Sequence, residues 1–235
     1  MSTLLLRLHG PLQSWGDSSR FTTRATRREP TKSGILGLLA AAEGRRRTDS
    51  IEDLLTLRFG VRTDQEGTVV RDFQTAMDWA HPARDGSVHS MPLSHRYYLS
   101  DATFLAGVEG EDSLLHGLDE ALRHPQFPLY LGRRSCPTEG QVSLGVRQTD
   151  LLDALRSQAW LASPWYRRRA AGEVRLPIAF DAAPGEVGDS VRDVPLSFDP
   201  TRREYGWRNV AWTHVDMTNP DGSSEPDWFA ALGGL

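Results

Sequence analysis

Residues 30–44 read PTKSGILGLLAAAEG, and this stretch predicts a helix with both ends marked. Thr31 or Ser33 can cap the first turn, and Gly44 ends the helix. Gly34 and Gly37 cost stability inside a helix, so we expect another element or a ligand to approach the backbone closely there. The apolar residues recur at helical spacing, at Ile35, Leu38, Leu39 and Ala42.

The start of this helix is also a candidate anion site. Residues 31–34 bring free backbone N–H groups, two hydroxyls and the ammonium of Lys32 to the positive end of the helix dipole. A phosphate suits such a site, and simple capping by Thr31 or Ser33 is the alternative. The residue order differs from that of a Walker loop, which argues against hydrolysis of nucleoside triphosphates.

The elements on both sides of this helix predict an α+β fold. Their order is strand, helix, strands, helix, strand, which is typical of a ferredoxin-like (RRM-like) sandwich. The predicted elements are a buried first strand at 3–9, a short helix at 50–57, a hairpin of 57–62 and 69–75 around a turn at 64–67, a β stretch at 97–108, a helix at 111–124 and a strand at 128–132.

Two regions lie outside this pattern. Residues 76–94 lack periodicity and are longer than the loops of compact domains, so we expect a protruding β-hairpin insertion there. We therefore predict a ferredoxin-like domain over 1–145 that carries this insertion, followed by a smaller β-rich lobe and tail over 146–235. The second region shows a helix and then three apolar stretches separated by Pro and Gly, at 150–162, 174–180, 191–198 and 205–215.

The charge distribution bears on whether the partner is a nucleic acid. The formal net charge of -4 argues weakly against such a partner, because proteins that neutralise phosphates are usually basic. Residues 1–60, however, hold ten Lys or Arg against six Asp or Glu, whereas the segment from Val215 holds four acids and no Lys or Arg. Lys32 is the only lysine, and arginine suits phosphates and stacks on bases, although codon usage in a GC-rich genome explains the same bias.

Several classes of protein are disfavoured by composition. The single cysteine, Cys136, cannot form an internal disulfide or build a metal site alone, so we expect a reducing compartment and no structural zinc or other cofactor. No apolar run reaches the roughly 18 residues that a membrane helix needs. We expect a soluble, cytoplasmic protein without a membrane partner.

Three arginine clusters are candidate contacts for nucleic acid. Residues 132–137, GRRSCP, directly follow a predicted strand and combine a flexible glycine, two guanidiniums and a hydroxyl, which suits a clamp on a phosphate backbone; a solvated turn is the alternative. Residues 165–169, WYRRR, pair aromatic rings with cations, as single-strand binders do, and are equally compatible with an exposed helix end. The arginines at 45–47 follow a helix, where we expect them to interact with the helix dipole.

The histidines are candidates for acid–base cleavage of RNA. His81, His89 and His95 lie near one another around residues 76–94, and Tyr97, Tyr98 or Lys32 would complete a catalytic set only if the fold brought them together. No pair of acids has the spacing of a metal site. We therefore predict no catalytic residue and no metal ligand.

Five blocks of sequence together resemble one protein family. They are LHGPLQSWG (8–16), PTKSGILGLL (30–39), RDFQT (71–75), HRYYLSDATF (95–104) and YLGRRSCP (130–137). In order and spacing they resemble the CasD family, the Cas-five-type RAMP proteins of type I-E CRISPR Cascade complexes. The resemblance covers roughly residues 4–145, whereas the later residues and 76–94 match only in character.

This resemblance implies a function as well as a fold. It implies a non-catalytic subunit with a ferredoxin-like domain and a β-hairpin thumb, which caps the 5′ handle of the guide RNA (crRNA). The implied neighbours are a CasC-type backbone subunit and a CasA-type large subunit, with target DNA met only through the complex. The alternative is a metal-independent endoribonuclease that processes precursor crRNA, as relatives in another subtype do with a Tyr, Lys and His set. A third hypothesis is a free-standing RNA-binding regulator.

The residues and the resemblance together give a predicted RNA-binding set. It comprises Arg24, Arg28, Lys32, Ser33, Gly34, Arg96, Gly132, Arg133, Arg134 and Ser135. In the predicted thumb, Trp79 and Met91 would contact displaced bases or a neighbouring subunit, and a small local core is the alternative.

Overall fold

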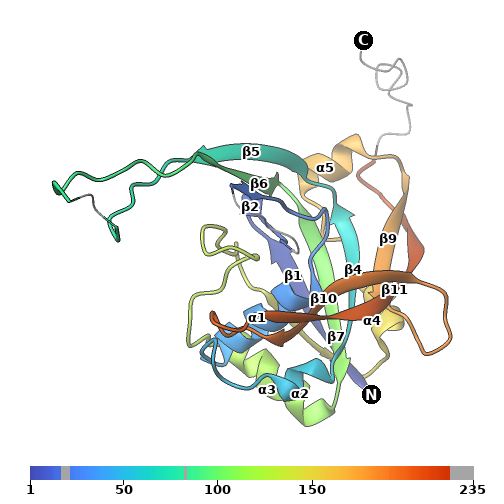
Figure 1. Cartoon of the computed structure of the whole chain (residues 1–235). Helices are drawn as coiled ribbons and strands as arrows, with labels where there is room; N and C mark the ends of the chain where they lie inside the picture. The colour runs from blue at the N-terminus through green and yellow to red at the C-terminus, as the bar shows by residue number, and fades with distance from the viewer. Residues whose placement is uncertain (17–21, 82–83, 223–235) are drawn as a thin grey trace.

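The computed structural model describes residues 1–16, 22–81 and 84–222 of the chain (Figure 1). In this part of the chain, the main sheet has seven strands, and every neighbouring pair runs antiparallel. With helices on its faces it confirms the predicted mixture of helices and strands. The strand order is β10 (Asp189–Ser197), β11 (Glu204–Thr218), β9 (Glu173–Asp181), β4 (Arg58–Gln65), β7 (Thr103–Gly110), β1 (Ser2–His9) and β8 (Ser143–Arg147).

The first strand shows why the sheet is covered on both faces. Leu4, Leu6 and Leu8 are fully buried in the larger core, and the intervening Leu5 is fully buried in a second core on the opposite face. Helices α1 (Lys32–Ala42) and α3 (Asp112–Arg123) contribute to the larger core, and α4 (Leu151–Ser157) to the smaller one. The predicted first strand and the helices predicted at 30–44 and 111–124 are confirmed.

A second, smaller sheet in the described residues is built around β6 (Ser94–Ser100). The strand β5 (Thr68–Gln74) pairs with it along its whole length, and β2 (Leu12–Gln13) and β3 (Thr23–Arg24) add short pairings. The hairpin predicted from 57–62 and 69–75 is therefore wrong, because β4 pairs with β7 and β9 instead. The reason is burial: β4 is buried almost throughout and takes a partner on each edge, whereas β5 is largely exposed.

Other predicted boundaries also change. The strand predicted at 128–132 is an irregular segment with one bridge, between Tyr130 and Pro137, and the strand that follows α3 is β8. The stretch predicted at 97–108 is divided between β6 and β7. The helix predicted at 50–57 is the shorter α2 (Glu52–Leu55), and that predicted at 150–162 ends at Ser157, before α5 (Pro164–Arg169). The proline at 164 fits the first turn of α5.

The connection between β5 and β6, residues 75–81 and 84–93, protrudes from the body and is called the arm here (Figure 1). A bridge between Met77 and Ser90 joins its two sides. Trp79 is 77% exposed and Met91 is 49% exposed, so neither side chain belongs to a local core. The arm coincides with the predicted insertion at 76–94, and its role as a thumb stays a prediction.

The C-terminal strands continue the main sheet. The strand β9 pairs with β4, with Gly60 opposite Phe180, and thereby joins β10 and β11 to the N-terminal strands. Residue 145 lies inside β8, so the predicted division into 1–145 and 146–235 does not coincide with a break in the sheet and stays a prediction. None of the helices in the described part is long and apolar enough to span a bilayer.

A fully buried arginine joins β4 to the end of α4. Arg62 donates two hydrogen bonds to Asp64, at 2.6 and 2.8 Å, and others to the carbonyls of Leu155 and Gln158. The guanidinium thus satisfies backbone acceptors that the helix leaves unpaired at its C-terminus. Burial raises the pKa of Asp64, and the hydrogen bonds from Arg62 oppose that shift.

Candidate nucleic-acid interface

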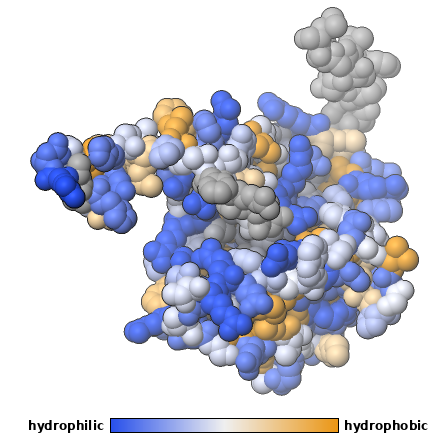
Figure 2. Space-filling model, in the orientation of Figure 1, coloured by the Kyte–Doolittle hydropathy of each residue, from blue (hydrophilic) through white to orange (hydrophobic). Residues whose placement is uncertain are grey.

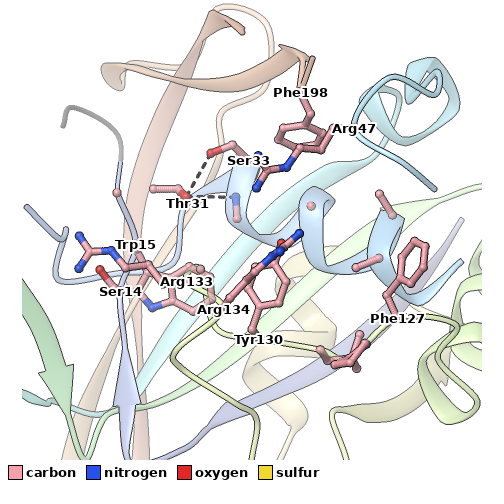
Figure 3. Close-up of a pocket in the computed structure, with 18 of the residues that line it drawn as sticks. Ser14, Trp15, Thr31, Ser33, Arg47, Phe127, Tyr130, Arg133, Arg134 and Phe198 are labelled. Carbon is pink, nitrogen blue, oxygen red and sulfur yellow. Dashed lines mark hydrogen bonds between the residues drawn. The ribbon is translucent and has the colours of Figure 1, made fainter. Parts of the chain in front are cut away.

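A groove of about 980 Å³ crosses the outer side of α1 (Figure 3). Its floor is made of the small residues of α1, from Ser33 and Gly34 to Ala41, so the helix backbone is accessible from outside. One wall is the segment 127–137, and Figure 3 shows Tyr130, Arg133 and Arg134 on that side. Phe198 and Arg47 lie on the other side of the helix.

The charge of this groove differs in sign from that of the whole chain. Its described lining contains no Asp or Glu. Figure 2 shows hydrophilic residues, in blue, gathered on the body below the arm. The lining includes seven arginines, which are Arg24, Arg45, Arg46, Arg47, Arg133, Arg134 and Arg203, and the aromatic residues Trp15, Phe127, Tyr130, Phe198 and Tyr205. Cations beside aromatic rings are what single-stranded nucleic acids need.

Two of the seven arginines hold the groove together. Arg133 donates to the carbonyls of Tyr97 and Arg24, at 3.2 and 2.9 Å, and stacks on the ring of Tyr98. Arg45 forms a two-pronged ion pair with Asp53, whose hydrogen bonds raise the pKa of Arg45 and lower that of Asp53. Both guanidiniums are therefore fixed in place by the protein.

The other five arginines have side chains that the described part of the protein leaves available to a ligand. Within the described residues, their guanidiniums make no hydrogen bond or ion pair to protein. They are Arg24, Arg46, Arg47, Arg134 and Arg203. Positive charges without internal partners are the ones available to neutralise phosphates.

The helix start is already occupied by protein groups. Asp193 accepts a hydrogen bond from the backbone N–H of Lys32 at 2.9 Å, and Thr31 accepts one from that of Gly34 at 3.2 Å. The ammonium of Lys32 lies 2.8 Å from a carboxylate oxygen of Asp181, and the residue is only 6% exposed. Lys32 is therefore outside the groove, whereas Thr31, Ser33 and Gly34 line it.

Of the two glycines of α1, only Gly34 has a neighbour too close for a side chain. A methyl group at Gly34 would lie 2.7 Å from the ring of Trp15, so the indole packs against the helix at a position that tolerates no side chain. At Gly37 it would reach ordinary contact distance, 3.5 Å, from the ring of Phe198. The expected close approach is thus made by protein at Gly34, while Gly37 faces the groove.

Gly132 is the residue that shapes the wall of 127–137. Its φ is +81°, and an added Cβ would lie 1.9 Å from the carbonyl oxygen of Ser14. Only glycine satisfies both conditions without movement of the backbone. This conformation directs the backbone of Arg133 and Arg134 along the groove.

Replacing Gly132 with alanine is expected to lower the free energy of unfolding by about 3–5 kcal/mol, because backbone strain and a steric clash combine. Chemical denaturation would measure the loss. Gly86 is the matched control, since it also has a positive φ, of +79°, but has no neighbour within 4 Å of an added Cβ. Alanine at Gly86 should cost only the backbone strain, and an equal loss at both sites would contradict the role of the Ser14 contact.

The structure brings together part of the predicted RNA-binding set. Arg24, Ser33, Gly34, Gly132, Arg133 and Arg134 line the groove. The remaining predicted residues do not line it. Arg28 and Ser135 are exposed elsewhere, Lys32 is paired with Asp181, Arg96 is half-buried on β6, and Trp79 and Met91 are on the arm.

Several groove residues were absent from the predicted set. The arginines at 45–47 are visible in the sequence, but their position after a helix predicts an interaction with the helix dipole and not with a ligand. Tyr130 opens the sequence block 130–137 but is not in the predicted set. Phe127, Phe198, Arg203 and Tyr205 give no local signal, because they become groove residues only through the way distant segments fold together. The WYRRR segment forms α5, where Arg169 stacks on Trp165, and it does not line the groove.

The candidate catalytic residues lie in different surroundings. His81 is on the arm, 3.2 Å from Asp78, and His95 is on β6, while Lys32 pairs with Asp181. In the residues that the structure describes, no three His, Cys, Asp or Glu side chains gather as metal ligands do.

Three comparisons relate this chain to known proteins. The family described as CRISPR-associated protein (Cas_Cas5) matches residues 3–211. The "CRISPR system Cascade subunit CasD" of Escherichia coli (strain K12) is 36% identical over 161 residues, which cover 63% of this chain and 72% of that protein.

Solved structures give the same result. A chain of a structure described as "CRISPR RNA-guided surveillance complex" superposes with a TM-score of 0.76 at 29% identity, covering 96% of this chain and 94% of that one. A "Crystal structure of Cas protein" gives a TM-score of 0.70 at 38% identity, covering 95% and 99%. The resemblance to CasD inferred from the sequence is thereby confirmed, and the chain belongs to the Cas_Cas5 family of CRISPR-associated proteins.

Proposed function

We propose that this chain is a non-catalytic subunit of a type I-E Cascade complex that binds and caps the 5′ handle of the crRNA. The observation that carries the proposal is the groove over α1, lined by seven arginines and, in the part described, by no acid. A relative named as a Cascade subunit and a solved RNA-guided surveillance complex support the setting. The protein would act in the cytoplasm and need no cofactor.

The shape of the groove favours a single strand of RNA. The small residues along α1 let a phosphate backbone come close to the helix. The five guanidiniums that have no partner among the described residues would neutralise its charge. Tyr130, Phe198 and the neighbouring rings offer surfaces on which unstacked bases pack. The acidic remainder of the chain would limit nonspecific binding of nucleic acid.

The proposed fold assignment is ferredoxin-like, as in the RAMP proteins. The elements β1, α1, β4, β7, α3 and β8 follow one another as βαββαβ, and their strands lie in the order β4, β7, β1, β8. The arm would be the thumb, with exposed apolar side chains such as Trp79 and Met91 for a partner. The proposed partners are crRNA, a CasC-type backbone subunit and a CasA-type large subunit, with target DNA bound indirectly.

The experiment that tests this function separates binding from cleavage. The purified chain is incubated in EDTA with labelled repeat RNA, and both retention and integrity of the RNA are measured. We expect wild type to retain the RNA intact and the double variant Arg133→Ala/Arg134→Ala to lose it. Cleavage by wild type would replace this proposal with the processing endoribonuclease, in which case His89→Ala or His95→Ala should abolish the cut.

A further inference from the structure

The C-terminal strands contribute to the groove as well as to the sheet. Phe198 directly follows β10, Arg203 directly precedes β11, and Tyr205 lies at the start of β11; all three line the groove. Figure 3 shows Phe198 across α1 from Tyr130 of the segment 127–137. Phe198 approaches α1 at Gly37, where an added Cβ would lie 3.5 Å from its ring. The hairpin therefore stands close to the helix that forms the floor.

A buried network of four charged side chains joins this hairpin to α1. Asp193 of β10 accepts two hydrogen bonds from Arg208 of β11, at 2.6 and 2.9 Å, and one from the backbone N–H of Lys32. Asp181, at the end of β9, accepts from the Lys32 ammonium at 2.8 Å and from Arg208 at 2.7 Å. Two cations face two anions, so the cluster is internally balanced.

The burial of this network makes its geometry well defined. The side-chain exposures are 8% for Lys32, 13% for Asp181, 1% for Asp193 and 12% for Arg208. Burial lowers the pKa of Arg208, but the bonds and charges of Asp193 and Asp181 outweigh it, so the pKa is raised overall. In such surroundings a lost partner leaves an uncompensated charge, so the four groups hold α1 and the hairpin in one arrangement.

We infer that the β10–β11 hairpin forms the second wall of the RNA groove, and that Lys32, Asp181, Asp193 and Arg208 are positioning residues that fix this wall over α1. The inference rests on the proposed function. It gives the C-terminal strands a role in RNA binding, and it gives Lys32 a role that requires no contact with phosphate.

Salt dependence distinguishes a phosphate contact from a positioning residue. A cation that neutralises a phosphate of single-stranded RNA contributes about 0.7 to the slope of log affinity against log salt. A positioning residue changes the affinity and leaves the slope unchanged. We therefore expect Arg203→Gln to reduce the slope by about 0.7, and Lys32→Met to weaken binding about 3- to 30-fold at constant slope.

For Asp193→Asn, the two explanations predict changes in RNA affinity of opposite sign. Removing a negative charge near a bound polyanion should strengthen binding if charge alone matters, whereas loosening the wall should weaken it. We expect weakening of about 3- to 30-fold. The matched control is Asp216→Asn, which removes an exposed acid on β11, the strand that pairs with the β10 strand of Asp193, and lies outside the network. This variant should bind as tightly as wild type or slightly tighter.

The measurement uses the full chain and labelled repeat RNA over a series of salt concentrations, at a temperature where circular dichroism shows every variant folded. Lys32→Arg keeps a cation opposite Asp181 and should restore binding to within about threefold of wild type. If a network variant fails to fold, the salt slope of Arg203→Gln still shows whether the β10–β11 hairpin contacts the RNA.

The outcomes separate this inference from the proposed function. If wild type does not retain the RNA, the proposed function fails and this inference fails with it. If wild type binds and Arg134→Gln weakens it, the function stands. Three results would then overturn the inference while the proposed function stands. They are an unchanged slope of log affinity against log salt for Arg203→Gln, a reduced slope for Lys32→Met, and undiminished RNA binding by Asp193→Asn.

Discussion

Replacing Arg46, Arg47 and Arg134 together with alanine is expected to weaken binding of single-stranded repeat RNA by roughly 50-fold at about 0.15 M salt. These three guanidiniums line the groove and, in the described residues, make no hydrogen bond or ion pair to protein. Their loss should therefore remove phosphate contacts without removing contacts that stabilise the fold. Fluorescence anisotropy over a series of salt concentrations measures both the affinity and the slope.

The slope is the more specific part of this result. Three lost phosphate contacts should make the plot of log affinity against log salt less steep by about 2. The matched control is Arg156→Ala/Arg168→Ala/Arg175→Ala, which changes the net charge equally but lies outside the groove. Equal weakening by the control would show that overall charge, and not the groove, governs binding.

Replacing Arg62 with methionine is expected to lower the free energy of unfolding by about 3–5 kcal/mol. The change removes the guanidinium from Asp64 and from the carbonyls at the end of α4, all in the interior. Urea denaturation would measure it. The control Arg175→Met breaks an exposed ion pair with Asp216 and should stay close to wild type.

The pH dependence of the Arg62→Met variant identifies the cause of its instability. Burial already raises the pKa of Asp64, and without Arg62 that pKa should rise further. A raised pKa in the folded state means that the folded variant gains stability as the pH falls toward the ordinary carboxyl range, near 4, and loses it as the pH rises. The deficit relative to wild type should therefore be largest at neutral pH. A deficit independent of pH would point to lost packing instead.

The local parts of this structure could be predicted from the sequence. The helix of residues 32–42 is specified by its own cap and spacing, and Thr31 does accept the capping hydrogen bond. Strand pairing could not be predicted, because the partner of a strand depends on segments far away in the chain. β4 and β5 are adjacent in sequence and alternate in pattern, yet β4 pairs with β9, more than a hundred residues later.

In the candidate site, too, the residues that local sequence marks could be predicted, and those that depend on distant segments could not. Arg133 and Arg134 were predicted from a local cluster after a glycine, and they line the groove. Lys32 was predicted from its place at a helix start, where the acids that bind it, Asp181 and Asp193, could not be foreseen. The arginines at 45–47 become groove residues only because the segment 127–134 folds beside them.

The pairing of β4 with β9 also has a consequence for synthesis on the ribosome. The core strand β4 emerges early, but its second edge stays open until β9, residues 173–181, has been translated. Throughout that interval β4 presents an edge of unpaired backbone groups, which is a template for aggregation. Chaperone capture before residue 173 is translated would protect this protein during its own production.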